Sequence, residues 1–598
     1  MLDPNQRSVL TTLLTPPPGM VFDQGLATTF TLDPLTLLGV PLHLAWLASQ
    51  EDRGVLTDAI RLLEALQRVT KRLTVFSDRG RIHVPGQANA LFALLEDAIV
   101  EVRAPRGGCF HPKLWLLRFV GADGSVVLRL GVLSRNLTSD RSWDLSLVLE
   151  GTPKGSYAAT NRELGELIKG LPGWAVGGID ADRRDHVEQL ADELRRTAWD
   201  LPGRWDELAF HVIGTKRGPW DPGWADDLAV ISPFLTPAAL DLLRKGARRP
   251  MALVSRPDTL AALPAVARGA FERCLVLDDA AETEDGEEPE HRDTIGLHAK
   301  AVVLRRGWYM HLFVGSANAT GAAIVDATNV EVMVELKGRH SQVGRIEQLL
   351  DPKVGFAGVL TDFDPQTEID PEEAARAEVE AAIERIQLRV AAAPLTVRCA
   401  PAPAGDWRLT LSTEAPIVLD GVAARAWPLS LLPDRGTEAS ALGTGETVDL
   451  GIVAAADVTG LVGFELALNG IALRFALNLR VDGLPEGRDA AILRRIVRNR
   501  EGFLRYLRLL LGMLGTGLEV EDETGTGGGG TWKGSGSGAD EALLEDLVRA
   551  WSREPARLRD VQRVVERLRG HEAEDGAVVP PDFEALWAVF EQVLGEAR

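Results

Sequence analysis

The sequence predicts an α/β protein in which one α/β unit is built twice, followed by a small β-sandwich and a C-terminal helical region. Strand-like apolar runs alternate with segments of helical spacing, and this rhythm starts again near residue 205. Each rhythm leads to a segment of the form H-x-K-x-x-x-x-R, at 111–118 and at 298–305. With 598 residues, of which 45% are hydrophobic, the chain can bury several cores.

The elements of the two units follow in order. In the first, helical spacing over 30–48 and 58–70 precedes a strand with its turn at 71–85. In the second, a strand at 224–236 leads into a helix over 237–247, with Thr236 at its N-cap position and Pro237 at its first position. Another strand is expected at 249–257. The acidic stretch at 278–293 is interpreted as a solvated loop.

The remaining 250 residues predict different structures. Residues 370–393 have helical composition and form a connector. Short strand-like runs with turn punctuation indicate a β-sandwich, and they lie at 395–400, 407–413, 415–421, 446–454 and 464–481. A helix over 486–513 carries seven arginines from Arg488 to Arg508, and it is either an ordinary amphipathic helix or a surface for a polyanion or a protein partner.

These elements divide the chain into nine expected segments. They are an N-terminal extension (1–20), a first half (21–165), a helical connector (166–204), a second half (205–350), a helical connector (351–395), the β-sandwich (396–482), the arginine-rich helix (483–520), a glycine-rich linker (521–540) and a C-terminal helical module (541–598).

Composition narrows the classes of function. The net charge of −21 argues against a surface that attracts polyanions everywhere, so any such site must be local. The first twenty residues lack the pattern of a signal peptide, and no apolar run is long enough to span a bilayer, so we expect a cytoplasmic protein. The three cysteines, Cys109, Cys274 and Cys399, are widely spaced and suggest neither a disulfide framework nor a zinc site.

The two H-x-K segments align without a gap, and each is followed by further matching polar residues. Because side chains alternate along a strand, the histidine and lysine of each segment point the same way. If the halves pack about a pseudo-twofold axis, both sets surround one pocket. The first set is His111, Lys113, Arg118, Ser134, Asn136 and Asp144, and the second is His298, Lys300, Arg305, Ser316, Asn318 and Glu331.

This inventory suits displacement at a phosphodiester. The two lysines and two asparagines would hold the phosphate oxygens, while one histidine attacks phosphorus and the other protonates the leaving oxygen and then activates water. Asp144 and Glu331 would each orient a histidine. The lysines and asparagines take the role that a bound cation would play, so we expect neither a metal nor a cofactor. A lone H-x-K pair would be a solvated strand edge, but two copies in register indicate an active site.

The paired motifs resemble those of the phospholipase D superfamily, which carries two copies of H-x-K-x-x-x-x-D, each followed by G-S-x-N and a carboxylate. "GLHAKAVVL", "FVGSANATG" and "NVEV" match closely, while "FHPKLWLLRF" and "LSRNLTSDRSWD" match loosely. Arg118 and Arg305 stand where the superfamily usually has Asp. In lacking that Asp, the chain is similar to the tyrosyl-DNA phosphodiesterase branch and to bacterial phospholipase D-like nucleases. The resemblance implies two α/β/α halves with the site at their seam, and a phosphohistidine route with His111 as nucleophile and His298 as acid.

The favoured function is a metal-independent phosphodiesterase acting on DNA or RNA. Arg135 and Arg141 near the pocket suit a long phosphodiester chain, whereas Arg118 and Arg305 either contact substrate phosphates or, as we favour, are structural strand ends. By analogy with the family, the context is bacterial defence against phage. The alternatives are a phospholipase or phosphatidyl transferase, and a non-catalytic nucleic-acid-binding scaffold that recruits a partner such as a helicase through the β-domain or C-terminal helices. One chain can complete one site, so the oligomeric state stays open.

Overall fold

A computed structural model describes about three quarters of the chain. The described residues are 10–49, 69–138, 142–278, 296–351, 353, 356–365, 371–489 and 491–492, with 572–573, 576–577 and 587 further on. Arg141, the linker at 521–540, nearly all of the acidic stretch at 278–293, nearly all of the C-terminal module and most of the arginine-rich helix lie outside these residues.

A seven-stranded sheet occupies the first part of the chain, in the order β3-β2-β1-β4-β5-β6-β7. Strands β1, β2 and β3 are parallel, and β4 to β7 continue from β1 in antiparallel pairs. The strands are β1 (Met20–Thr29), β2 (Leu73–Asp78), β3 (Ile99–Val102), β4 (Leu114–Gly121), β5 (Val126–Leu133), β6 (Ser146–Pro153) and β7 (Thr197–Trp199). The helices are α1 (Leu10–Leu14), α2 (Pro34–Ser49), α4 (Arg162–Gly170) and α5 (Ala181–Arg196).

An eight-stranded sheet repeats this arrangement, in the order β15-β11-β10-β9-β12-β13-β14-β8. Strands β9, β10 and β11 are again parallel, and β12, β13 and β14 follow β9 in antiparallel pairs. The strands are β8 (Glu207–Ile213), β9 (Ala225–Ile231), β10 (Ala247–Val254), β11 (Arg273–Leu277), β12 (Ala301–Arg306), β13 (Tyr309–Gly315), β14 (Glu331–Arg339) and β15 (Leu360–Asp362). The helices are α6 (Pro237–Lys245), α7 (Pro257–Ala262), α8 (Ala265–Arg268), α10 (His340–Val343) and α11 (Ile346–Leu349).

Helix α6 begins as the sequence predicts, with Thr236 as N-cap residue and Pro237 in the first turn. The Thr236 side chain makes no capping hydrogen bond, so the fixed φ of Pro237 and the apolar face of the helix determine its start. Leu240 and Leu243 on that face are buried against the second sheet.

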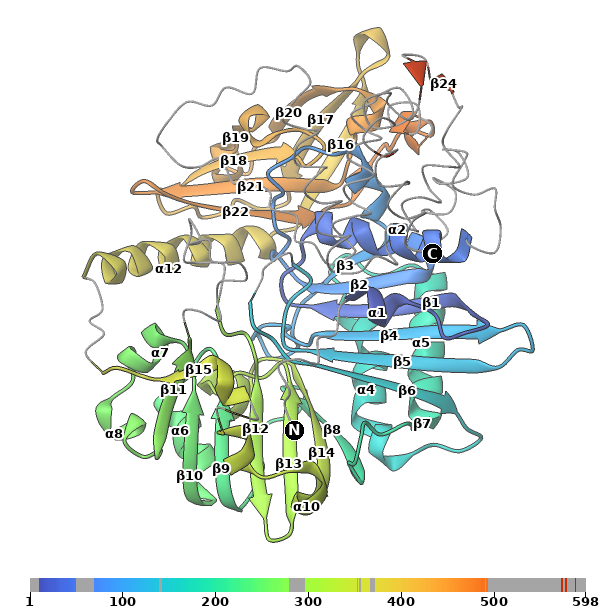
Figure 1. Cartoon of the computed structure of the whole chain (residues 1–598). Coiled ribbons are helices and arrows are strands. Elements are labelled where there is room, and N and C mark those ends of the chain that lie inside the picture. Colours follow the sequence, from blue (N-terminus) through green and yellow to red (C-terminus); the bar gives the residue numbers. More distant parts are fainter. Residues whose placement is uncertain are drawn as a thin grey trace.

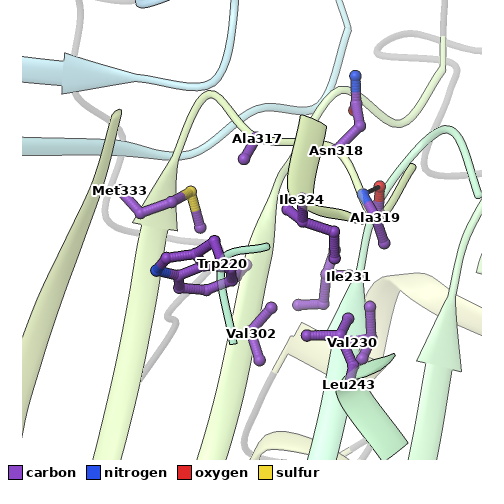
Figure 2. Close-up of a pocket in the computed structure, with 12 residues that line it drawn as sticks. Trp220, Val230, Ile231, Leu243, Val302, Ala317, Asn318, Ala319, Ile324 and Met333 are labelled. Carbon is purple, nitrogen blue, oxygen red and sulfur yellow. Dashed lines mark hydrogen bonds between the residues drawn. The ribbon is translucent and has the colours of Figure 1, made fainter. Parts of the chain in front are cut away.

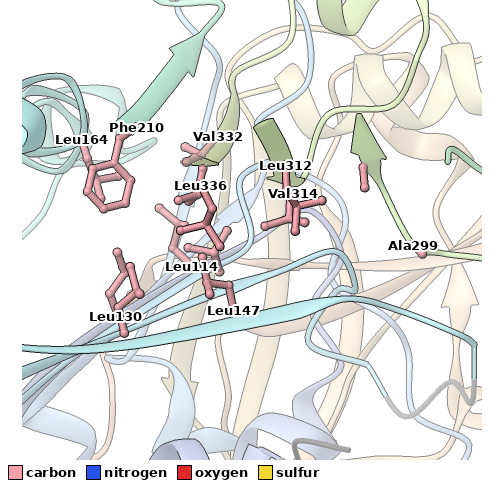
Figure 3. Packing of buried hydrophobic residues seen from close by; sticks show 14 of the residues in the cluster. Leu114, Leu130, Leu147, Leu164, Phe210, Ala299, Leu312, Val314, Val332 and Leu336 are labelled. Atoms are coloured by element: carbon pink, nitrogen blue, oxygen red, sulfur yellow. The ribbon is translucent and has the colours of Figure 1, made fainter. Parts of the chain in front are cut away.

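One core joins the two sheets. Figure 3 shows Leu130 of the first sheet below Phe210 of the second, and Leu114 and Leu147 of the first sheet next to Leu336 of the second. These side chains belong to a single cluster of buried apolar residues, so the faces of both sheets are removed from water together. The seam between the sheets is therefore fixed by packing, and loops at its edge hold constant positions relative to one another.

A smaller unit follows helix α12 (Pro371–Ala392), which runs beside it in Figure 1. Two four-stranded sheets enclose a common apolar core, to which Ile383, Ile386 and Val390 of α12 contribute. Their strands are β16 (Leu395–Pro401), β17 (Trp407–Thr413), β18 (Ala423–Pro428), β19 (Thr437–Glu438), β20 (Val448–Val453), β21 (Leu461–Leu468), β22 (Ile471–Asn478) and β23 (Val481–Asp482).

The strand expected at 415–421 is wrong. Pro416 has no amide hydrogen for a ladder, and Asp420 and Gly421 have φ of 49° and 80°, so this segment ends in a turn. The strand β18 begins just after the turn, at Ala423, in a stretch that carries too many alanines to predict a strand.

The smaller unit docks on the edge of the first sheet through buried ionic contacts. Glu101 pairs with Arg79 and also accepts the Asn478 amide at 2.8 Å. Arg488 pairs with Glu96 at 2.8 Å and is buried, so this arginine of the predicted basic helix is structural. Gly80 lets the chain pass close to α12, because a Cβ there would lie 2.7 Å from the Ala391 side chain. The loop after β2 is therefore held from both sides.

Among the helices in the described ranges, none combines the length and the apolar character that crossing a bilayer requires.

Candidate active site

The two H-x-K segments lie at the seam between the sheets, each just before a strand. His111 and Lys113 precede β4, and His298 and Lys300 precede β12. Each segment is held by the other half of the protein. The His111 amide donates to the Val330 carbonyl at 3.0 Å, and the His298 amide donates to the Trp143 carbonyl at 2.7 Å.

These cross-pairings repeat with one offset. Phe110 forms a parallel β-bridge with Val330, and Trp143 forms one with Leu297. Leu297 lies 187 residues after Phe110, and Val330 lies 187 residues after Trp143. The same offset relates His111 to His298. Each half therefore positions the histidine segment of the opposite half, and the two motifs meet in one place.

Glu331, the first residue of β14, contacts His111 across the seam. Its Oε2 lies 2.8 Å from Nδ1 of His111, and its side chain is 0% exposed. The Ser316 hydroxyl donates to the same Oε2 at 2.5 Å and accepts from the Val332 amide at 3.1 Å. The carboxylate is thus fixed in a dry setting, where it orients the imidazole and leaves Nε2 as the ring nitrogen available for reaction.

Burial lowers the pKa of His111, because it disfavours the charged imidazolium, although Glu331 partly offsets this. The neutral ring therefore persists to lower pH than in an exposed histidine. A neutral imidazole with one nitrogen held by a carboxylate has the electronic state that a nucleophile requires.

Two buried lysines face the same point. Lys113 donates to the His111 carbonyl at 3.0 Å, and Lys300 donates to the His298 carbonyl at 2.7 Å and to the Ser134 carbonyl of the other half at 3.2 Å. Burial lowers the pKa of Lys113 well below its usual value, and the nearby Lys300 ammonium lowers it further. A bound anion would reduce the repulsion between these two neighbouring cations, so the arrangement favours anion binding.

The asparagines end short loops at equivalent places. Ser134 and Ser316 follow β5 and β13. Each accepts the amide hydrogen of the residue after the carboxylate of its own half, from Leu145 at 2.7 Å and from Val332 at 3.1 Å. Two residues further on, the buried Oδ1 atoms of Asn136 and Asn318 have no hydrogen-bond partner within the described ranges. Buried carboxamide oxygens without a partner thus stand at matching positions in both halves.

The other predicted residues have different surroundings. Asp144 lies just before β6 with its side chain 22% exposed, and Arg135 approaches it at 3.4 Å. Arg118 pairs with Asp23 and Glu193. Arg305 pairs with Asp226 and Asp227. The carboxylate partners of Arg118 and Arg305 favour the structural interpretation of these arginines.

Three residues near His111 belong to no motif. The Phe30 ring lies 5.0 Å from the His111 ring. The Arg81 guanidinium lies over the Phe30 ring, 5.1 Å from its centroid. Asp78, at the end of β2, accepts the Phe110 amide at 2.8 Å, and burial raises its pKa to about 7. No motif marks them in the sequence: Phe30 opens a run of helical spacing, and Asp78 and Arg81 lie in the predicted strand and turn at 71–85.

A small, mainly apolar pocket lies beneath the second asparagine. Figure 2 shows Trp220, Val302 and Met333 around it, with the Asn318 side chain directed away from these residues. The lining carries no ionisable side chain, so the reactive groups lie outside the cavity. In the part of the chain that the structure describes, no three His, Cys, Asp or Glu side chains are grouped to hold a metal ion.

No family model and no curated protein matches the chain. Among solved structures, it is similar to two variant forms of yeast tyrosyl-DNA phosphodiesterase and to phosphatidylserine synthase from Haemophilus influenzae. The first variant form has a TM-score of 0.32 and 14% sequence identity, and the match covers 53% of this chain and 82% of the other. The second has a TM-score of 0.30 and 14% sequence identity, and the match covers 54% of this chain and 85% of the other. The synthase has a TM-score of 0.31 and 12% identity over 64% and 91%. The chemistry proposed below depends on this chain's own side chains.

Proposed function

We propose that the protein is a phosphodiesterase of phospholipase D type that cleaves nucleic acid, with one active site assembled from two pseudo-symmetric halves. The observation that carries the proposal is the pairing of His111 with the fully buried Glu331 of the opposite half. A buried carboxylate held on one ring nitrogen prepares the other nitrogen for attack, and the neighbouring buried lysines supply charge for the phosphate oxygens.

In the first step, Nε2 of His111 attacks phosphorus. An N–P bond forms while the bond from phosphorus to the leaving oxygen breaks, and His298 donates the proton that the leaving oxygen takes up. Lys113, Lys300 and the carboxamides of Asn136 and Asn318 hold the non-bridging oxygens as their charge grows.

In the second step, His298 accepts a proton from water. The water oxygen bonds to phosphorus, the N–P bond breaks and His111 returns to its neutral form. The lysines and asparagines supply the electrostatic stabilisation, so the proposed route is metal-independent.

Nucleic acid is the proposed substrate because the basic groups are local. Lys113 and Lys300 supply positive charge at the site on a chain whose net charge is −21. Such a site accepts a phosphate chain at one place without attracting polyanions to the whole surface. A role with a protein partner in anti-phage defence stays a prediction, because nearly all of the expected C-terminal helices lie outside the described residues.

Cleavage of labelled single-stranded DNA, duplex DNA, RNA and phosphatidylcholine vesicles in EDTA tests the proposal. The intact chain is compared with His111→Ala, His298→Ala and, as a matched control, His340→Ala. His340 lies in α10 and stacks on Trp308, outside the site. We expect nucleic-acid cleavage by the intact chain and the control, and its loss in both site variants. Cleavage of lipid alone, or binding of DNA without cleavage by any form, would contradict the proposal.

A further inference from the structure

A second arginine lies over a second phenylalanine on the rim of the site, in the half that carries His298. The Arg256 guanidinium lies 5.5 Å from the centroid of the Phe234 ring. Phe234 follows β9 and Arg256 follows β10, so the pair lies at the edge where these parallel strands end. Phe234 is 45% exposed, so its ring is accessible to a ligand.

Backbone contacts fix this pair beside the catalytic groups. The Ala319 amide, next to Asn318, donates to Ser232 Oγ at 3.0 Å, and the same hydroxyl donates to the Phe234 carbonyl at 2.7 Å. The loop that carries Phe234 therefore lies against the asparagine loop.

Arg256 approaches the segment that leads to His298. A Cβ built on Gly296, two residues before His298, would lie 2.9 Å from Arg256 Nη2. Glycine at 296 leaves the guanidinium in this place, whereas a side chain there would displace its end. Within the described ranges, the contacts of this guanidinium are the Phe234 ring and Gly296, so its charge is not neutralised by a carboxylate.

The two halves differ at this position. The strand registers align Phe76 of β2 with Val254 of β10. Phe76 pairs with Thr28 of β1, which also pairs with the first residue of β4. In the same way, Val254 pairs with Ile231 of β9, which also pairs with the first residue of β12. Two residues further on, Asp78 therefore corresponds to Arg256. At this position the first half has a buried carboxylate, whereas the second half has a guanidinium stacked on an exposed ring.

We propose that Phe234 and Arg256 form a platform for one nucleotide next to the scissile phosphate, with its base on the Phe234 ring and its phosphate on the Arg256 guanidinium. An exposed ring stacks with any base, and an arginine held on a ring presents its remaining donors to phosphate. A base paired in a duplex cannot reach such a ring, so the preferred substrate is single-stranded nucleic acid. This inference rests on the proposed function and names the substrate form.

The test uses the full chain with a fluorescent oligothymidylate, the same strand in a duplex, and bis(p-nitrophenyl) phosphate, a small diester without bases. The variants are Phe234→Ala and Arg256→Gln, with Trp308→Ala as control. Trp308 is 76% exposed and stacks on His340, and it lies in the turn between β12 and β13, at the strand ends opposite the site.

We expect Phe234→Ala to raise KM for the single strand about ten- to a hundredfold, and to lower kcat/KM on the strand at least tenfold more than on the small diester. The control should leave both reactions unchanged. Equal losses on strand and diester, or equal cleavage of duplex and single strand by the intact chain, would overturn the platform. No hydrolysis of the diester by any form would instead overturn the proposed function.

Discussion

Replacement of Glu331 by glutamine is the most informative single change at the site. The substitution keeps the shape of a side chain that is 0% exposed but removes its charge, which lies 2.8 Å from His111 Nδ1. A hydrogen bond to a charged group is worth about 1.5–3 kcal/mol, which corresponds to roughly a 10- to 150-fold change in rate. The amide can also donate to Nδ1, and the ring proton would then occupy Nε2 and block attack. We therefore expect kcat to fall at least about 100-fold.

The pH profile distinguishes this role from a merely structural one. Burial is the largest influence that lowers the pKa of His111, and the Glu331 charge raises it. Removing that charge lowers the pKa further, so the acidic limb of kcat/KM should move to lower pH. The assay is diester hydrolysis across pH, with thermal unfolding to show that the variant folds.

Asp144→Asn is the matched comparison. Asp144 occupies the corresponding position in the first half, but its side chain is 22% exposed and lies 3.4 Å from Arg135. Partial exposure weakens its electrostatic influence, so we expect a loss smaller than about tenfold. Hydrolysis by Glu331→Gln within twofold of the natural chain, with an unmoved pH profile, would refute the reasoning.

Three further predictions concern buried charges. Lys113→Met should lower kcat about 100- to 1000-fold without loss of stability in urea, because a buried ammonium is costly; retained activity would contradict it. Burial raises the pKa of Asp78 from 3.8 to about 7, so its contribution to the free energy of unfolding falls as pH rises from 3.8 to 7. At pH 8, Asp78→Asn should therefore be more stable than the natural chain, by up to about 4 kcal/mol. A variant equally destabilised at pH 5 and pH 8 would refute this. Glu101→Ala breaks a buried ion pair and should cost about 3–5 kcal/mol in urea unfolding, whereas the exposed Glu380→Ala should cost about 0.5 kcal/mol or less; equal effects would contradict the docking role.

The sequence alone predicts the residues of the site better than their partners. Gapless matching aligns His111 with His298 and Asp144 with Glu331, because both halves keep polar residues where strands begin and end. That Glu331 contacts the histidine of the opposite half depends on how two sheets pack through one core, and no local pattern reports such packing. The pairing became visible only in the structure.

Residues at and just after strand ends had no functional signal in the sequence. Phe30 and Phe234 follow strands and Asp78 ends one, without any spacing that ties them to the motifs. Asp78 contacts the site by accepting a hydrogen bond from the backbone amide of Phe110. Almost any residue at position 110 could donate that bond, so the sequence carries no sign of the contact. In the smaller unit, alternation predicted β16 and β17 well, whereas β18 was missed because alanine carries little strand signal.

Trapping of the covalent intermediate tests the central claim most directly. A turnover mixture with the small diester is quenched, and the phosphorylated peptide is identified by mass spectrometry in the natural chain, in His298→Ala and in His111→Ala. We expect a p-nitrophenylphosphoryl adduct on His111, because one aryl ester stays on phosphorus when the other leaves. The adduct should accumulate in His298→Ala, since loss of the acid and base slows hydrolysis of the N–P bond, and it should be absent from His111→Ala. Turnover without an adduct on either histidine, or full activity in either variant, would contradict it.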